Sequence, residues 1–314
     1  MNLFSLHMVQ VDPATAANAV DIDQIESIGY EAGTQRLIRA ATVDTKFAAI
    51  LAQAHRFSIV NSALATLLAE ASGKYLTNAL PIDSGGETPG AVMWYKKRAD
   101  LGTFASGAAH IKCTVASGMI LPRGLNVAVN ALATMSQDLV AIYDGTNEPV
   151  VTATGQAIAG TPGADEYFTL GPVYIDTTEV EEAQGFAITA GLAERLRFGS
   201  KYPTWPTYLG IAARQPSVTV NLLDVTWLNT LGLAGSGHEI TLFLRKLENK
   251  AKTYADNTAN HIKLVINKAH VSVDTISAQF SGEAEPGLVI TPVQDSSDND
   301  IIQVTTSTAI VAPT

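Results

Sequence analysis

Apolar and polar residues alternate along several short runs of the chain. In residues 217–223, Val218, Val220 and Leu222 share one face, while polar residues take the other. A period of two is typical of strands that bury one face. Residues 301–311 are rich in Thr, Val and Ile, which favour strands. These runs predict a protein built largely from half-buried strands.

Two stretches have helical rather than strand character. Residues 62–71 are rich in Leu and Ala, and Ser62 is placed to cap a helix there. Residues 224–231 are the corresponding stretch later in the chain. We therefore expect a mostly β fold made of two tandem β-sandwich or barrel domains, each with about one flanking helix.

The chain repeats itself at a spacing of roughly 150 residues. Residues 109–112 (AHIK) recur as residues 260–263 (NHIK), and residues 92–97 match residues 241–246 as an apolar and aromatic run that ends in a basic pair. Two further matches keep the same order, residues 58–59 with 217–218 and residues 154–158 with 306–310. Ordered matches of this kind indicate an internal duplication.

The two copies differ most in one loop. Residues 74–90 contain several Pro and Gly residues and predict a long mobile loop, whereas the second copy has only residues 235–238 there. The pattern breaks at residues 159–164, which predict the linker. We place the first domain, with its long loop, at residues 1–160 and the second at 161–314.

Composition suggests where this β protein buries its surface. Only 16% of residues are charged, against about 25% in ordinary soluble domains. No stretch approaches the roughly 20 apolar residues that span a bilayer, and residues 1–11 lack the basic start of a secretory signal. We therefore expect a protein that stays where it is made and buries much surface against other subunits.

Candidate chemistry is sparse. The net charge of −10, with 30 acids against 20 bases, argues against tight DNA binding. No P-loop, GxSxG, HExxH or Rossmann motif occurs, so we expect neither an enzyme nor a cofactor or metal site. Cys113 is expected to be a buried thiol, and the repeated His110 and His261 are expected to be packing or hydrogen-bonding residues.

One acidic run has two interpretations. Asp176 is followed by Glu179, Glu181 and Glu182. A solvated loop is the plain interpretation, and an acidic lining of a channel that DNA passes is the sharper one.

The order of several short segments resembles that of a known family. The segments are residues 20–22 (VDI), 28–31 (IGYE), 56–59 (RFSI), 94–95 (WY), 109–111 (AHI), 167–173 (YFTLGPV) and 202–204 (YPT). They resemble siphophage tail tube (major tail) proteins, and the resemblance extends over nearly the whole chain.

The resemblance implies β-sandwich or barrel domains whose strands join those of neighbouring subunits around a hollow bore. A tandem-duplicated member implies homotrimeric, pseudo-hexameric rings that stack into a tube in the virion. The tube is assembled in the host cytoplasm and conducts DNA without specific binding. Implied partners are further copies of the chain and the tape measure, terminator and distal tail proteins. Long loops reach the adjacent ring in this family, and the candidates for that role are Lys74, Asp83, Gly85, Gly86 and Glu87.

Other functions stay open on the sequence alone. A distal tail, baseplate or decoration protein shares the same fold features. A carbohydrate-binding β-sandwich would need exposed aromatic platforms, for which Trp94, Trp205 and Trp227 are the candidates. Trp94 and Trp227 have apolar neighbours, which favours core packing and leaves Trp205 as the plausible exposed ring.

Overall fold

In a computed structural model of the chain, strands account for almost all the regular structure. The structure describes residues 4–11, 20–41, 44–82, 90–99, 103–158, 166–223, 234–248, 255–278, 284–294 and 301–313. Within these ranges there is one α-helix, α1 (Ala65–Gly73), and one 3-10 turn, η1 (Tyr75–Thr77). The predicted mostly β class is confirmed.

The first half forms two antiparallel sheets and a projecting hairpin. Its strands are β1 (Phe4–Val11), β2 (Val20–Ile22), β3 (Ile25–Glu31), β4 (Gln35–Ala41), β5 (Asp44–Ala52), β6 (Arg56–Asn61), β7 (Leu80–Ile82), β8 (Ala91–Lys97), β9 (His110–Val115), β10 (Ser117–Ala128), β11 (Thr134–Ile142) and β12 (Val150–Gln156). One sheet has the order β12-β9-β8-β1-β2. In the other, β3 pairs with β6, β6 with β11, and β11 with β10, whose start also pairs with β7.

The second half repeats this pairing order. Its strands are β13 (Phe168–Ile175), β14 (Thr178–Glu179), β15 (Ala183–Thr189), β16 (Leu192–Phe198), β17 (Pro206–Arg214), β18 (Ser217–Leu222), β19 (Ala234–Lys246), β20 (His261–Ala278), β21 (Ala284–Pro292) and β22 (Gln303–Thr308). The long strand β19 takes the place of the two strands β7 and β8, and β20 takes the place of β9 and β10. Each pairs with the counterparts of the strands that those two pair with. The other strands of this half follow the first-half order one for one, from β13 in the place of β1 to β22 in the place of β12.

Register shifts at equivalent places in the two halves show which residue of one half corresponds to which residue of the other. β3 shifts register between Ile25 and Ser27, and β15 shifts between Ala183 and Gly185. The correspondence of β6 with β18 then matches Phe57 to Val218, two residues from the match that the sequence alone gives. A two-residue difference keeps every side chain on the same face, because side chains alternate along a strand. The domain limits 1–160 and 161–314 stay predictions, since residues 159–165 lie outside the described part.

A shared hydrophobic core fills the space between the sheets. Alternation in β18 behaves as predicted, with Val218, Val220 and Leu222 buried. The equivalent histidines are buried and do the same work: Nδ1 of His110 accepts the N–H of Lys97 at 3.1 Å, and Nδ1 of His261 accepts the N–H of Lys246 at 2.9 Å. The expected hydrogen-bonding role of both is confirmed.

The expected long loop is shorter than predicted. Tyr75 and Leu76 in η1 are fully buried, and β7 pairs with β10 in the sheet. Apolar burial therefore orders residues 74–82, although Pro81 lies among them. Residues 83–89 lie outside the described part, as does the second expected helix at 224–231. The first expected helix is present as α1, but Ser62 does not cap it: Leu64 is at the N-cap position, and the Ser62 hydroxyl donates to Glu26 at 2.9 Å.

Candidate assembly interface

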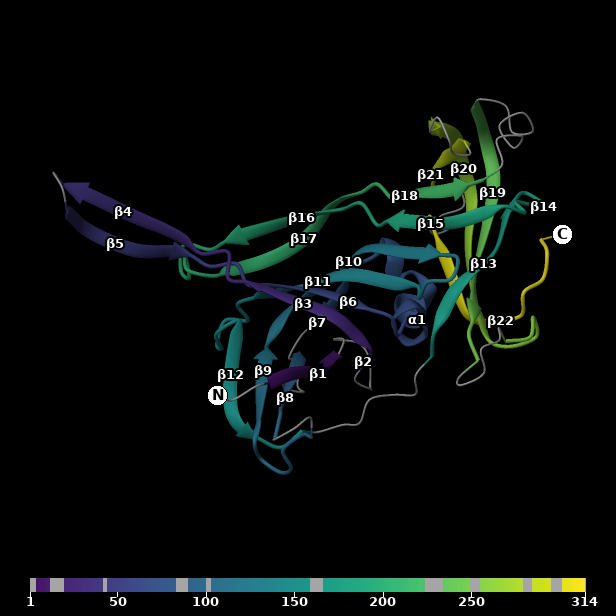
Figure 1. Cartoon of the computed structure of the whole chain (residues 1–314). Coiled ribbons are helices and arrows are strands. Elements are labelled where there is room, and N and C mark those ends of the chain that lie inside the picture. Colours follow the sequence, from purple (N-terminus) through teal and green to yellow (C-terminus); the bar gives the residue numbers. More distant parts are fainter. Residues whose placement is uncertain are drawn as a thin grey trace.

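The two halves of the chain are joined by strand pairing. β10 of the first half pairs antiparallel with β15 of the second, with Leu125 opposite Ile188 and Val127 opposite Phe186. This pairing makes one sheet of thirteen strands that runs through both halves (Figure 1). The backbone groups of β15 that would otherwise face solvent are bonded to β10.

The β16–β17 hairpin adds a second layer to this junction. It follows directly after β15 and lies along β10 and β11 (Figure 1). A small apolar cluster from both halves packs between them: Leu121, Val140, Ala190, Leu192 and Leu209. Near the hairpin tip, Trp205 stacks on Tyr143 at a centroid distance of 5.3 Å. The tip is therefore held by aromatic contact as well.

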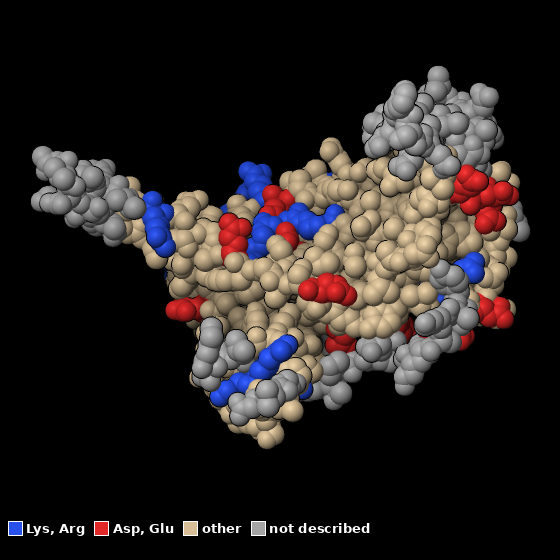
Figure 2. Space-filling view, viewed as in Figure 1, with Lys and Arg blue, Asp and Glu red and all other residues tan. Residues whose placement is uncertain are grey.

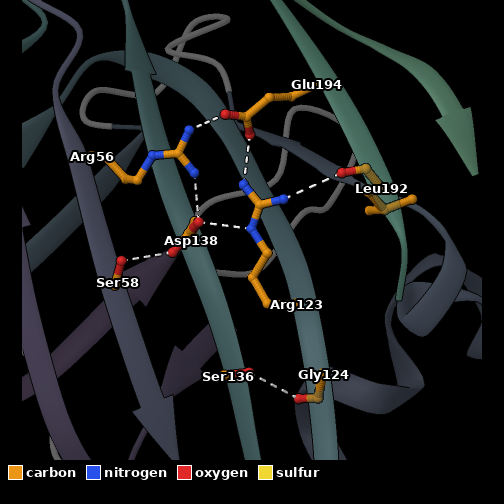
Figure 3. A network of polar contacts seen from close by, with 8 residues as sticks. All are labelled: Arg56, Ser58, Arg123, Gly124, Ser136, Asp138, Leu192 and Glu194. Carbon is orange, nitrogen blue, oxygen red and sulfur yellow. Dashed lines mark hydrogen bonds and ion pairs between the residues drawn. The ribbon is translucent and has the colours of Figure 1, made fainter. Parts of the chain in front are cut away.

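An ion-pair network closes the junction (Figure 3). Asp138 on β11 accepts hydrogen bonds from Arg56 at 2.5 Å, from Arg123 at 2.7 Å and from Ser58 at 2.8 Å. Glu194 on β16 binds the same two guanidinium groups, Arg123 at 2.7 Å and Arg56 at close range. Two arginines of the first half thus bind one carboxylate of the second, and Asp138 binds both arginines.

The network lowers the pKa of its central acid. Burial acts to raise the pKa of Asp138, but the hydrogen bonds from Ser58, Arg123 and Arg56 outweigh it and hold that pKa below the ordinary value. Asp138 is therefore an anion that neutralises two partly covered cations.

Helix α1 makes the third contact between the halves. Its buried residues Leu67 and Leu68 belong to the common core, and its end lies against β22 of the second half. A Cβ on Gly73 would stand 2.2 Å from the carbonyl oxygen of Val304, so only glycine fits there.

The first-half counterparts of these buried surfaces are open. β3 occupies in the first half the place that β15 has in the second, yet β3 is largely exposed. Tyr30 of β3 corresponds to Ile188, and their exposures are 54% and 2%. The β4–β5 hairpin, the counterpart of β16–β17, extends away from the body as an arm (Figure 1). Within the described chain, no strand pairs with the outer edge of β3.

An apolar pocket of about 440 Å³ opens beside β3. It is lined by Phe4, Tyr30, Phe57, Tyr95, Ile111, Cys113, Val150 and Thr152. The residues at the same places in the second half are all buried: Phe168, Ile188, Val218, Leu244, Ile262, Leu264, Ile302 and Val304. In the second half, α1 covers Val304, which is the counterpart of Thr152. In the first half, no described element covers Thr152 in this way, and the pocket is open there.

The complementary open edge is the last part of β20, which extends beyond its pairing with β19. Thr275–Ala278 of β20 correspond to the β10 residues that pair with β15, because both strands change register just before them. They pair with β21 on one side. On the other side, no described strand pairs with them. The chain therefore has two open strand edges that correspond to the two sides of its own junction, β3 in the first half and Thr275–Ala278 in the second.

The acidic candidates for a channel lining lie on either side of β14: Asp176 is in the β13–β14 turn, Glu179 ends β14, and Glu181 and Glu182 precede β15. Asp176 accepts the N–H of Glu239 at 3.0 Å and pairs with His238 at 2.9 Å. Burial acts to raise the pKa of Asp176, and these contacts lower it overall. Glu179, Glu181 and Glu182 are exposed. Figure 2 shows acidic side chains at the end of the molecule that carries β14, and most of the face in view has no charge.

The candidates for a loop to an adjacent ring are only partly described. Lys74 ends α1 and is half-buried, so it is part of the packed body. Asp83, Gly85, Gly86 and Glu87 lie outside the described residues.

The remaining candidates for chemistry have structural roles in the described chain. Cys113 is buried, and burial raises the pKa of its thiol to about 11. Trp94 is buried and donates to Gln10 at 2.9 Å, whereas Trp227 lies outside the described residues. Among the described residues, no cluster of His, Cys, Asp and Glu could hold a metal ion, and no helix is long and apolar enough to cross a membrane.

Comparison with known proteins gives no family. Neither a family model nor a curated protein matches this sequence.

Sequence reasoning missed the residues that build the junction. Arg56, Arg123, Asp138 and Glu194 are far apart along the chain, and only strand register brings them together. A usable signal existed in the glycines: Gly33 and Gly191 stand at equivalent places before the two hairpins, and both have positive φ.

Proposed function

We propose that this chain is a self-assembling structural protein whose subunits repeat, between chains, the junction that joins their two halves. The observation that carries the proposal is the open edge and apolar pocket of the first half, whose counterparts in the second half are buried by the junction. The edge of β3 would pair with Thr275–Ala278 of the next chain, and the β4–β5 arm would lie on the β20–β21 face of that chain.

Such contacts run head to tail, so they propagate until a ring closes. Together with the resemblance of the sequence, this favours the tail tube of a long-tailed phage, in trimeric rings of six modules that stack into a tube for DNA. The low charge of the chain supports a protein that is largely covered by neighbours. Asp176, Glu179, Glu181 and Glu182 are our candidates for the lining of the bore, where acids should outnumber bases.

The junction register gives a specific test. If β3 pairs with β20 as β15 pairs with β10, Tyr30 stands opposite Ile276 of the next chain, as Ile188 stands opposite Leu125 within one chain. In a Cys113→Ser background, the Tyr30→Cys and Ile276→Cys pair should form a disulfide between chains under mild oxidation. The Leu125→Cys and Ile188→Cys pair is the matched control and should form one within a chain.

Denaturing gels and electron microscopy separate the outcomes. A ladder of covalent oligomers and hollow rings or tubes are expected. Long tubes favour the tail tube, and single rings favour a distal tail or baseplate component. A chain that stays monomeric at high concentration, with only the control disulfide formed, would rule out the proposal.

A further inference from the structure

The junction within the chain depends on a charge pair at one defined place. Arg123 is the extra residue at the register shift of β10, which lies between Pro122 and Gly124. Glu194 is the first residue of β16 after the register shift in that hairpin. Their side chains meet at 2.7 Å.

The same two places carry opposite charges at the open edges. The register shift of β20 lies between Val273 and Thr275, so Asp274 takes the place of Arg123. The hairpin shift of β4 lies between Gln35 and Arg36, so Arg36 takes the place of Glu194. Arg36 is exposed and makes no ion pair with another described residue.

The other members of the network have no charged counterparts. Ser217 stands at the place of Arg56, and Val289 stands at the place of Asp138. Of this network, the proposed junction between chains therefore keeps charges only at the positions of Arg36 and Asp274. The strand of this junction carries the acid and its hairpin the base, whereas within the chain the strand carries Arg123 and the hairpin carries Glu194.

We propose that Arg36 of one chain pairs with Asp274 of the next, and that the reversed signs select which module meets which. This inference rests on the proposed head-to-tail assembly. A correct junction within the chain brings Arg123 to Glu194, and a correct junction between chains brings Asp274 to Arg36.

Wrong combinations bring like charges together. If the second module of one chain met the second module of another, Glu194 would face Asp274. If two first modules met, Arg36 would face Arg123. Like charges brought together at an interface suppress the wrong partner more strongly than a matched pair strengthens the right one. Both wrong combinations require an open junction within a chain, because β10 is otherwise paired with β15. The reversal therefore disfavours them wherever that junction has not yet formed.

Charge reversal and its rescue test the pairing. Arg36→Glu and Asp274→Arg should each raise the concentration at which wild-type assemblies form by at least about tenfold, because each places like charges at the junction. The double variant Arg36→Glu with Asp274→Arg should restore assembly. Sedimentation across a concentration series measures the effect, and circular dichroism checks that each variant is folded.

A matched control separates the pair from net charge. Lys201→Glu changes the charge by the same amount as Arg36→Glu at an exposed place on the β16–β17 hairpin, and should assemble as wild type does. Single variants that assemble normally, or a folded double variant that is not rescued, would overturn the pairing and leave the assembly proposal intact. A wild-type chain that never assembles would overturn both.

Discussion

At the scale of residues, the junction within the chain is held by charges that water reaches only in part. Asp138 is buried and accepts three hydrogen bonds, while the two arginines that donate to it keep 25% and 30% of their side chains exposed. A carboxylate in this position stabilises the fold through its ionised form. Removal of its charge leaves two cations close together beside Glu194.

This arrangement predicts a loss of stability in Asp138→Asn. The variant should lose about 1–3 kcal/mol of unfolding free energy, since the arginines are partly solvated and a fully buried pair would cost more. Ser58→Ala removes only one of the three hydrogen bonds and should cost less. Urea unfolding at neutral pH measures both, and equal losses would contradict the central role of Asp138.

The pH dependence follows from the lowered pKa of Asp138. A folded-state pKa below the unfolded one adds stability that is complete above about pH 3.9, the ordinary carboxyl value, and is lost as the pH falls below it. Wild type should therefore lose stability on acidification more steeply than Asp138→Asn does. Parallel curves would show that other acids govern the acid limb.

Residue-scale prediction succeeded where a role depends on neighbours in sequence. The predicted hydrogen-bonding role of the repeated His110 and His261 is confirmed, because each lies in a strand and accepts a hydrogen bond from the strand before it. The network of Asp138 could not be predicted, because it depends on the registers of several strand pairs. One residue of slip in any of them would point its side chain to the opposite face.

At the scale of elements, the fold depends on how each hairpin leaves its sheet. β3 and β15 each end in a short turn through a glycine with positive φ, Gly33 at 53° and Gly191 at 60°, before the hairpin begins. A Cβ on Gly33 would stand 2.7 Å from the carbonyl oxygen of Ala54, and one on Gly191 would stand 1.9 Å from that of Gln215. Both turns therefore require glycine for space as well as for conformation.

A graded series of alanine variants follows from these distances. Gly107→Ala, with φ 69° and open space around it, should cost about 1–2 kcal/mol from backbone strain alone. Gly33→Ala should cost more, and Gly191→Ala most, because the added methyl meets backbone that cannot move aside. Thermal unfolding ranks the three variants, and a Gly191→Ala that unfolds like Gly107→Ala would contradict the steric argument.

Elements were predictable where one face is apolar and the other polar. The strand at residues 217–223 follows from such alternation, whereas the helix at 62–71 follows from its Leu and Ala content. Residues 74–82 did not, because Pro and Gly nearby suggested a loop, whereas Tyr75 and Leu76 bury their side chains and order the segment. Tertiary burial outweighed the local turn signals there.

At the scale of the whole molecule, the two halves share an order of strand pairing but differ in which of their edges and apolar surfaces are buried. The second half has its edge strand paired and its apolar opening closed, and the first half has both open. The sequence predicted the repeat, since its matches follow the paired strands. It could not predict the difference in cover, because equivalent positions such as Phe4 and Phe168 are apolar in both halves.

The open pocket predicts a change in dye binding on assembly. Dilute chains should bind an apolar fluorescent dye such as ANS at the pocket beside Tyr30, and fluorescence should fall as assemblies form and a neighbour covers it. Thr152→Glu should weaken dye binding by placing a negative charge beside the anionic dye on the pocket wall. Fluorescence that stays constant while light scattering rises would show that assembly leaves the pocket uncovered.

Because the two modules are parts of one polypeptide, any closed ring of these chains would alternate two sorts of seam. The interface within a chain forms when the chain folds. Only the interface between chains requires association with a second molecule. In the proposed trimeric ring of six modules, two encounters would join the three chains, and the third seam would close within the assembled trimer. The proposed ring would have threefold symmetry. A protein that recognises one of the two modules would therefore find three binding sites on the ring, one third of a turn apart.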